Sequence, residues 1–398
     1  MRTIAIIGAG ASGLAAAVEA AHEAERSGCE ARIELYEAAD RVGKSILATG
    51  NGRCNLSNAS VDASLYRNAG FVAEALSALP ESEVLSLFGQ LGLIVREESD
   101  GRLYPATNKA SSVLDILRFA VRERGVQVSC GAEVGAVEQA GTRFRIGLSG
   151  GSDTIADAVV IACGGRSIQS LAPTAHRIVH AEPVLGPIAT ETATIKGLNN
   201  IRVRCAVSLF DGIGKNLKAK EEGEVLFRDY GVSGIAVFNL SRFSQKGDVL
   251  SLDLVPGITE AALAADLESR TKRMPDRTAT EVLAGVVVGP VARAVLGAAG
   301  LNADEALRTD ACWRLARSLK SFELAVQGPG DVRQCQVTRG GLDVAQFRGD
   351  TMESLLHQGL YAAGEALDVD GPCGGFNLHW AWASGMLSGR SAVRTCCR

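Results

Sequence analysis

Glycines near the start of the chain are spaced for binding the phosphates of a dinucleotide. Gly8, Gly10 and Gly13 form a GxGxxG motif directly after an apolar run at residues 4–7. The first glycine permits a tight turn, the second lets a pyrophosphate approach the backbone, and the third lets the next helix pack against the strand. The N–H groups that begin this helix attract phosphates. An acid, Glu37, ends a second apolar strand and can accept hydrogen bonds from ribose hydroxyls.

Two later segments favour FAD over NAD as the dinucleotide. The apolar strand at 159–162 runs into a glycine turn at 163–165, which can lie beside the first glycine loop. Another apolar strand ends in Gly364 and Glu365, whose carboxylate can bind ribityl hydroxyls. A simple NAD dehydrogenase needs neither feature. A helix expected at 377–393 follows a glycine-rich segment, so its first N–H groups can stabilise negative charge on a reduced flavin.

Length and composition are those of a globular protein with more than one domain. The chain has 398 residues, of which 46% are hydrophobic and 22% charged, and its net charge is −4. This charge gives no electrostatic reason to expect nucleic acid or acidic membranes as partners. Glycines and a serine interrupt the apolar start at 4–21, so a buried strand and helix explain it better than a signal peptide or an anchor. We expect a cytoplasmic protein.

The cysteines and histidines predict neither a disulfide framework nor a metal site. None of the ten cysteines forms a CxxC pair, and we expect most of them to be small buried side chains. Cys396 and Cys397, near the end of the chain, are expected to be exposed. His176 and His180 share a helical spacing, but no neighbouring carboxylate or cysteine completes a ligand set.

The hydrophobic pattern predicts a nucleotide-binding domain that is interrupted by an insertion. After residue 170, short alternating strands separated by glycines predict a β domain or barrel, with strands at 202–210, 224–227, 236–240 and 249–254. Residues rich in alanine, leucine and arginine then predict a helical cluster. The predicted domains are a discontinuous FAD-binding domain at 1–170 plus 336–398, an inserted β domain at 171–257 plus 321–335, and a small helical domain at 258–320.

The most specific motif is GKSILATGNGRCNLSN at residues 43–58. With this motif the chain resembles the HI0933-like, BaiN-like (aminoacetone-oxidase-like) family of bacterial FAD-dependent NAD(P)/FAD oxidoreductases, and the resemblance covers essentially the whole chain. The resemblance implies an α/β fold, with a Rossmann-type, glutathione-reductase-like FAD-binding domain that carries an inserted β-barrel-like domain and a small helical domain. Further matching motifs are GRLYP at 101–105, GEVLF at 223–227, VTRGG at 337–341, and the segments 364–371 and 374–378.

The sequence departs from the family pattern at four positions. Ile235 stands where the family has proline, and Cys163 replaces a threonine. Both changes are conservative for FAD binding. Cys373 and His379, which stands where glutamine is common, are expected near the flavin and indicate an altered substrate.

The resemblance places residues 51–55 along the isoalloxazine ring and the ribityl chain. Arg53 can stabilise reduced flavin or bind an anionic substrate group, or it can clamp loop carbonyls. Cys54 can be a redox thiol, but a packing role is favoured because no resolving cysteine is near it in sequence. Tyr104 can line the substrate cavity or belong to the core. The predicted catalytic residues are Arg53, Asn55, Lys109 and His379.

The predicted cofactor-binding residues follow the same motifs, and no metal ligand is predicted. They are Gly8, Gly10, Ala11, Ser12, Gly13, Glu37, Ala38, Lys44, Thr49, Gly50, Asn51, Arg53, Cys54, Asn55, Val134, Ala162, Cys163, Gly164, Gly364, Glu365, Asp368, Gly374, Gly375, Asn377 and Leu378.

A single nucleotide fingerprint predicts one resident dinucleotide, FAD, and no second domain for NAD(P)H. We expect an FAD-dependent oxidoreductase that transfers hydride between flavin N5 and a small organic substrate. NADH or NADPH would act as a transient co-substrate in an ene-reductase-like reaction. The alternatives are an amine or aminoacetone-type oxidase that uses oxygen, an RNA-modifying flavoprotein, and a non-catalytic flavin redox sensor that uses Cys54 or Cys373. The expected partners are a small-molecule substrate but no nucleic acid or membrane, and the chain is expected to be a monomer or homodimer.

Overall fold

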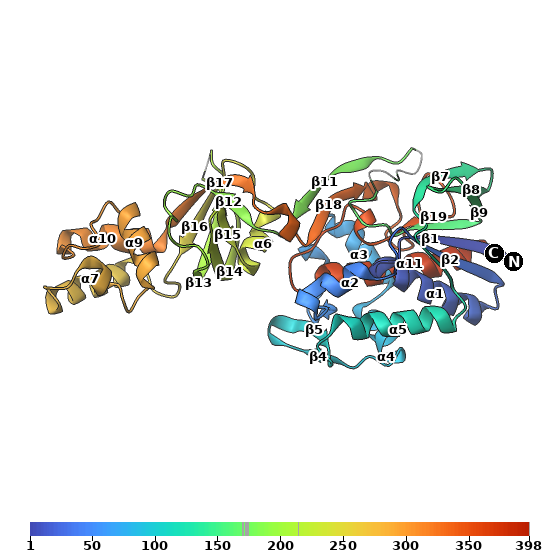
Figure 1. The fold of residues 1–398 in the computed structure, drawn as a ribbon, viewed down its shortest axis with the longest axis horizontal. Helices are drawn as coiled ribbons and strands as arrows, with labels where there is room; N and C mark the ends of the chain where they lie inside the picture. The colour runs from blue at the N-terminus through green and yellow to red at the C-terminus, as the bar shows by residue number, and fades with distance from the viewer. Residues whose placement is uncertain (169–170, 172–174, 214, 398) are drawn as a thin grey trace. The chain divides into compact units, whose positions relative to one another are not determined.

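The chain divides into two compact units, of which one is inserted into the other. The computed structural model describes residues 1–168, 171, 175–213 and 215–397. The first unit consists of Met1–Glu182 and Val337–Arg398, and the second of Pro183–Gln336 (Figure 1). Each unit has a hydrophobic core of its own.

A five-stranded parallel sheet forms the centre of the first unit, in the order β19-β10-β1-β2-β6. The residues of β10 and all but the first of β1 are buried, as expected for strands covered on both faces. Because the strands are parallel, their carboxyl ends meet at one edge, where α/β sheets bind ligands. The strands are β1 (Arg2–Ile7), β2 (Ala31–Glu37), β6 (Gln127–Cys130), β10 (Ala158–Ile161) and β19 (Leu360–Ala362).

Two long helices, α1 (Ala11–Ser27) and α11 (Phe376–Cys396), lie side by side and run in the same direction (Figure 1). Their backbones approach so closely that a Cβ at Gly385 would lie 2.3 Å from the Ser12 carbonyl oxygen. Further along, Arg390 pairs with Glu19 at 2.8 Å and Arg394 with Glu23 at 2.8 Å. The N-terminal and C-terminal segments of the chain are therefore joined along the whole of α1.

Smaller elements surround this core. Pro80 separates two short helices at residues 69–78 and 81–90. The further helices are α2 (Lys44–Ala48), α3 (Ala69–Ala78), α4 (Glu81–Gln90) and α5 (Ala110–Glu123), with 3₁₀ turns at η1 (Thr49–Gly52), η2 (Ala63–Leu65), η3 (Ser99–Gly101), η6 (Val344–Gln346) and η7 (Gly364–Ala366). The further strands are β3 (Ser57–Asn58), β4 (Val95–Glu97), β5 (Arg102–Pro105), β7 (Val134–Ala140), β8 (Arg143–Leu148), β9 (Asp153–Ala156), β11 (Ile178–Val184) and β18 (Val337–Leu342).

The second unit contains a closed barrel in the order β12-β15-β14-β13-β16-β17, together with helices. One continuous core runs through the barrel and the helices, so a separate helical domain at 258–320 stays a prediction. The strands are β12 (Ile188–Thr190), β13 (Arg202–Phe210), β14 (Leu217–Arg228), β15 (Gly231–Ser233), β16 (Val249–Asp253) and β17 (Phe322–Pro329). The helices are α6 (Ile235–Ser241), α7 (Glu260–Arg273), α8 (Ala279–Val282), α9 (Gly289–Ala298) and α10 (Cys312–Lys320), with 3₁₀ turns η4 (Thr309–Ala311) and η5 (Val332–Gln334).

The strand predicted at 236–240 is wrong, since these residues lie within α6. Gly234, with φ of 111°, turns the chain sharply after β15. Val237 and Leu240 are then buried three residues apart, on one face of a helix. An apolar run this short does not distinguish a strand from a helix.

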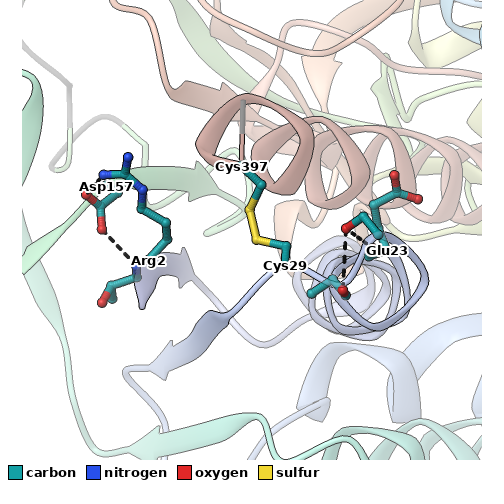
Figure 2. Close-up of a disulfide and its surroundings, with 8 residues drawn as sticks. Arg2, Glu23, Cys29, Asp157 and Cys397 are labelled. Carbon is teal, nitrogen blue, oxygen red and sulfur yellow. Dashed lines mark hydrogen bonds and ion pairs between the residues drawn. A yellow bond between two sulfur atoms is a disulfide. The ribbon is translucent and has the colours of Figure 1, made fainter.

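A disulfide joins Cys29, just after α1, to Cys397, which follows α11 (Figure 2). The two Cα atoms are 6.0 Å apart across a sequence separation of 368 residues. The expectation of unpaired cysteines is therefore wrong for this pair, because the parallel packing of α1 and α11 brings distant residues together. Cys396 remains outside the bond, and burial raises the pKa of its thiol to about 11. None of the described helices combines the length and the apolar character needed to cross a bilayer.

Candidate functional site

The first glycine loop connects β1 to α1 at the carboxyl edge of the sheet. Gly8 has φ of 100°, and a Cβ there would lie 2.5 Å from the Ala162 carbonyl oxygen. A Cβ at Gly13 would lie 1.8 Å from the Gly8 carbonyl oxygen. The loop therefore accepts glycine alone at both positions and lies against the end of β10, as the sequence predicted.

Glu37 ties the end of β2 to this loop. One carboxylate oxygen accepts from the Ala9 N–H at 2.8 Å and the other from the Ala39 N–H at 2.8 Å. The Ala132 N–H donates to the Glu37 carbonyl oxygen at 2.9 Å, which places Val134 and the start of β7 near the same strand end. A carboxylate has about four acceptor positions, so Glu37 keeps lone pairs for ribose hydroxyls.

The starts of α1 and α11 provide a test of whether FAD fits. Within the described chain, neither N-cap residue, Gly10 or Gly375, caps its helix with a side-chain hydrogen bond. A Cβ at Gly10 would meet the Ser45 Oγ at 3.3 Å, which leaves little room for a side chain, whereas glycine lets a phosphate approach the backbone N–H groups. Two uncapped helix starts and a glycine cradle are what a pyrophosphate and a flavin ring require.

The turn after β19 is fixed against both helices. The Gly364 N–H donates to the Ser384 Oγ at 2.9 Å, and the Trp380 indole N–H donates to the Gly364 carbonyl oxygen at 3.2 Å. A Cβ at Gly364 would lie 2.7 Å from the Ser12 Oγ, so a side chain there would push against the start of α1. The turn thus holds the next residue, Glu365, at the carboxyl edge.

The burial of the Glu365 carboxylate is only partly compensated. Burial raises the pKa of its carboxyl group to about 7, while the Thr338 N–H, 3.4 Å away, and the Arg166 charge oppose that rise weakly. Hydroxyl groups that donate to the carboxylate would favour its ionised form. Its environment therefore suits the predicted contact with ribityl hydroxyls, which stays a prediction.

A second loop, residues 50–54, is held in a left-handed conformation. Gly50, Asn51, Gly52 and Cys54 have φ angles of 55°, 56°, 82° and 59°. For Asn51 and Cys54 this region is uncommon, and such strain concentrates at functional sites. Cys54 is fully buried, and burial raises the pKa of its thiol to about 11, so a thiolate is disfavoured at neutral pH.

Arg53, within this second loop, is held from three sides. Its guanidinium donates to the side chains of Asn108 and Glu98 and lies 4.2 Å from the centre of the Tyr104 ring. Among the described residues, no hydrogen bond from its Nη1 atom is found, so one terminal nitrogen can serve a ligand. Lys109 follows Asn108 directly and is exposed.

Asn55 and His379 connect the second loop to the start of α11. In the amide orientation that satisfies both of its polar atoms, Asn55 accepts from the Gly375 N–H at 3.0 Å and donates to the Ser57 carbonyl oxygen at 3.1 Å. The His379 Nδ1 lies 2.9 Å from the Ser57 Oγ. His379 is fully buried, which lowers its pKa to about 4, and in the described structure its Nε2 has no hydrogen-bond partner.

Asp368 and Asp370 bind the protein itself. Asp368 accepts from the Arg67 Nε at 2.9 Å and from the Gly340 N–H at 3.0 Å. Asp370 pairs with Arg339 at 3.0 Å. Through these contacts both carboxylates order the loop, and the contact of Asp368 with FAD stays a prediction.

The other predicted cofactor residues lie at the same strand and helix ends. These are Ala11 and Ser12 at the start of α1, Ala38 after β2, Lys44 at the start of α2, Thr49 after it, Cys163 and Gly164 after β10, and Gly374, Asn377 and Leu378 around the start of α11. Burial raises the pKa of the Cys163 thiol to about 12. The described residues contain no group of three or more His, Cys, Asp or Glu side chains that could hold a metal ion.

Sequence reasoning missed the residues that hold Arg53 and His379. Asn108 directly precedes Lys109, a predicted catalytic residue, so its polar side chain was a usable signal. Glu98 is 45 residues from Arg53, and Ser57 is 322 residues from His379. No pattern in the sequence connects residues so far apart.

Comparisons with known proteins identify the family of this chain. The family model that matches, the HI0933-like protein Rossmann domain, spans residues 2–391. A 3-dehydro-bile acid Δ(4,6)-reductase from Clostridium scindens is 32% identical over 99% of this chain and 99% of its own. A ribosomal RNA dihydrouridine synthase from Haemophilus influenzae is 27% identical over 98% of each chain.

Among solved structures, a 3-ketosteroid-Δ4-(5α)-dehydrogenase from Rhodococcus jostii RHA1 is similar, with a TM-score of 0.46. It is 15% identical and covers 98% of this chain and 97% of that one. The family match extends over nearly the whole sequence, and the glycine loop, Glu37 and the two helix starts fit a flavin dinucleotide. The chain therefore belongs to the HI0933-like family of flavin-dependent oxidoreductases.

Proposed function

We propose that the protein reduces carbon–carbon double bonds conjugated to a carbonyl group, with electrons from NADH or NADPH. The name of the C. scindens relative specifies reduction of the Δ4,6 bonds of a 3-dehydro bile acid. The H. influenzae relative is named for forming dihydrouridine, which is uridine with one ring double bond saturated. A double bond next to a carbonyl is the feature that these two otherwise unlike substrates share.

The observation that carries this proposal is an arginine held on a strained loop. When FAD is bound, its N5 atom supplies the hydride. Glu98, Asn108 and Tyr104 fix the Arg53 guanidinium and leave its Nη1 atom for a ligand. A donor in that position can bind the carbonyl oxygen of the substrate and stabilise the negative charge that develops there.

The carbon next to the carbonyl must also receive a proton. His379 is poorly suited to donate it, because burial lowers its pKa to about 4 and keeps the ring neutral at pH 7. Lys109 is exposed and lies next to Asn108, a residue that holds Arg53. We assign proton delivery to Lys109, directly or through one water molecule.

A small apolar enone is our first candidate substrate. The net charge of −4 favours a small molecule over RNA, and identity is higher to the bile-acid reductase than to the RNA-modifying relative. Reduction of uridine in ribosomal RNA is the second candidate, because that relative also matches over 98% of each chain. Aminoacetone-type oxidation is the remaining alternative, since hydride can move in either direction.

The test is an anaerobic flavin-reduction experiment. The FAD-loaded protein is mixed with NADH or NADPH, and then with a bile acid that carries a 3-oxo-Δ4,6 system. We expect the flavin band to bleach with one nicotinamide, to recover with the dienone, and to yield a product two hydrogens heavier. Arg53→Lys should slow the recovery and leave the bleaching intact.

Matched samples separate the alternatives. A ribosomal RNA fragment replaces the dienone in one sample, with dihydrouridine measured by mass spectrometry, and oxygen uptake is measured with aminoacetone in another. Product from RNA alone would move the assignment to the second candidate. Oxygen uptake with aminoacetone in the absence of nicotinamide would change the assigned function from a reductase to an oxidase.

A further inference from the structure

A cavity of about 380 Å³ lies beside the disulfide, in the first unit. Its lining includes Cys29, Arg32, Arg124 and Gln127, which lie at the starts of β2 and β6 and at the end of α5. This is the amino edge of the parallel sheet, opposite the edge that carries the glycine loop. The volume falls within the range of about 300–1,000 Å³ that small-molecule sites occupy.

The cavity presents guanidinium groups to a ligand. No hydrogen bond or ion pair is found for the Arg124 guanidinium within the described residues; its Nε is enclosed by the protein, so its terminal nitrogens are the donors left for a ligand in the cavity. Arg32 also lines the cavity, where its Nε lies 3.0 Å from a Glu34 carboxylate oxygen. Glu25 adds one acidic group to the lining. An arginine with an unused donor fits a carboxylate, and Glu25 fits an ammonium group on the same molecule.

The disulfide itself is accessible from this side. Cys29 is partly exposed and lines the cavity, and Cys397 is exposed at the end of α11 (Figure 2). A disulfide is opened by a thiolate that attacks one of its sulfur atoms, so reactivity depends on access and on the local concentration of thiolate. Positive charge beside the sulfur favours a thiolate in that place.

We propose that this cavity binds a low-molecular-weight thiol that carries carboxylate groups, and that the thiol exchanges with the Cys29–Cys397 disulfide. The ligand thiolate attacks the Cys29 Sγ and forms a mixed disulfide. The Cys29–Cys397 bond breaks, and the Cys397 thiolate takes a proton from water. A second thiol then attacks the mixed disulfide, which releases Cys29 as a thiol and the ligand as its own disulfide. Two ligand thiols are oxidised and one protein disulfide is reduced.

The experiment compares thiols that differ in charge. The oxidised, FAD-loaded protein is mixed anaerobically with glutathione, 2-mercaptoethanol or cysteamine, and intact-mass spectrometry follows the mixed disulfide at Cys29. After correction for thiolate fraction, glutathione should react about tenfold faster than 2-mercaptoethanol at low salt, and cysteamine should react slowest. S-methylglutathione, which cannot exchange, should slow the glutathione reaction alone.

Variants assign the effect to the cavity. Arg124→Gln should reduce the glutathione rate to that of 2-mercaptoethanol, and Arg124→Lys should retain part of the advantage. The control is Arg122→Gln, at the same end of α5, where the exposed side chain contacts Phe119 and does not line the cavity. An unchanged 2-mercaptoethanol rate and flavin spectrum verify that each variant is folded. Equal rates for the three thiols, or an Arg124→Gln variant that keeps the glutathione advantage, would overturn the proposal.

Discussion

The two loops that form the candidate flavin site are built in different ways. The first loop, Gly8–Gly13, runs from β1 into the first turn of α1 and is fixed mainly by residues near it in sequence, since Gly13 packs on the Gly8 carbonyl oxygen. One contact comes from further away, where Gly8 lies against Ala162 at the end of β10. The second loop, residues 50–54, places Asn51 and Cys54 in left-handed conformations. Its arginine is held by Glu98 and Asn108 from elsewhere in the chain.

This difference assigns cofactor binding to the first loop and contact with the substrate to the second. A cradle for phosphates needs close backbone approach and helix dipoles, which a short local motif supplies. An arginine that must meet a substrate needs a fixed direction, which distant partners supply at the cost of backbone strain. We therefore expect changes in the first loop to remove the cofactor and changes around the second to reduce turnover with the cofactor retained.

The largest expected effect is that of Gly13→Ala. The new Cβ would lie 1.8 Å from the Gly8 carbonyl oxygen, so α1 must move away from β1. We expect loss of bound FAD and a fall of about 3 kcal/mol in the free energy of unfolding. Flavin absorbance and urea denaturation measure both. The matched control is Gly89→Ala, since no atom lies within 4 Å of a Cβ there. If Gly13→Ala retained FAD, the close packing of the first loop would not be required for cofactor binding.

The second-largest expected effect is a pH dependence of the free energy of unfolding that is caused by Glu365. Its pKa is raised from 4.5 to about 7 in the folded protein, so the folded state binds more protons than the unfolded state between these values. The free energy of unfolding of the flavin-free protein should therefore fall as pH rises from 4.5 through 7, by up to about 3 kcal/mol. Glu365→Gln should remove that slope. Denaturant titrations at pH 5 and pH 8 test this, and an unchanged slope in the variant would exclude Glu365 as its source.

A smaller effect is expected from Glu98→Ala. The variant removes one charge-assisted contact to Arg53 and leaves Asn108 and Tyr104 in place. We expect FAD to remain bound and the rate of flavin reoxidation by substrate to fall about tenfold, which corresponds to about 1.4 kcal/mol. Stopped-flow absorbance measures that rate. Glu97→Ala, at an exposed neighbouring position, is the control. Loss of FAD in Glu98→Ala would show that the second loop also supports cofactor binding, which would contradict the division between the two loops.

The smallest effect is expected from Asn51. Its φ of 56° is unfavourable for alanine and freely accessible to glycine. Asn51→Ala should lower the free energy of unfolding by about 1 kcal/mol, and Asn51→Gly should restore most of that loss. Thermal denaturation of the two variants, side by side, measures the difference. If both variants unfold at the same temperature, the left-handed backbone conformation at position 51 does not destabilise the protein.

Much of the first loop could be predicted because its causes lie close together in sequence. The strand, the glycine turn, the helix and Glu37 all fall within the first 37 residues. Long-range features could not be predicted. The pairing of Cys29 with Cys397 depends on the direction in which α11 packs on α1, and cysteine positions alone do not specify a pairing. The contact between Arg53 and Glu98 similarly depends on how β4 and η3 fold back over the second loop.

The disulfide also turns most of the chain into a covalent ring. Cys29 and Cys397 are separated by 368 residues, and the whole second unit, Pro183–Gln336, lies within that ring. A single backbone cut inside a ring opens it without dividing the molecule. Oxidised protein nicked once between these two cysteines should therefore migrate as one species on a denaturing gel, and separate into two fragments once a thiol is added.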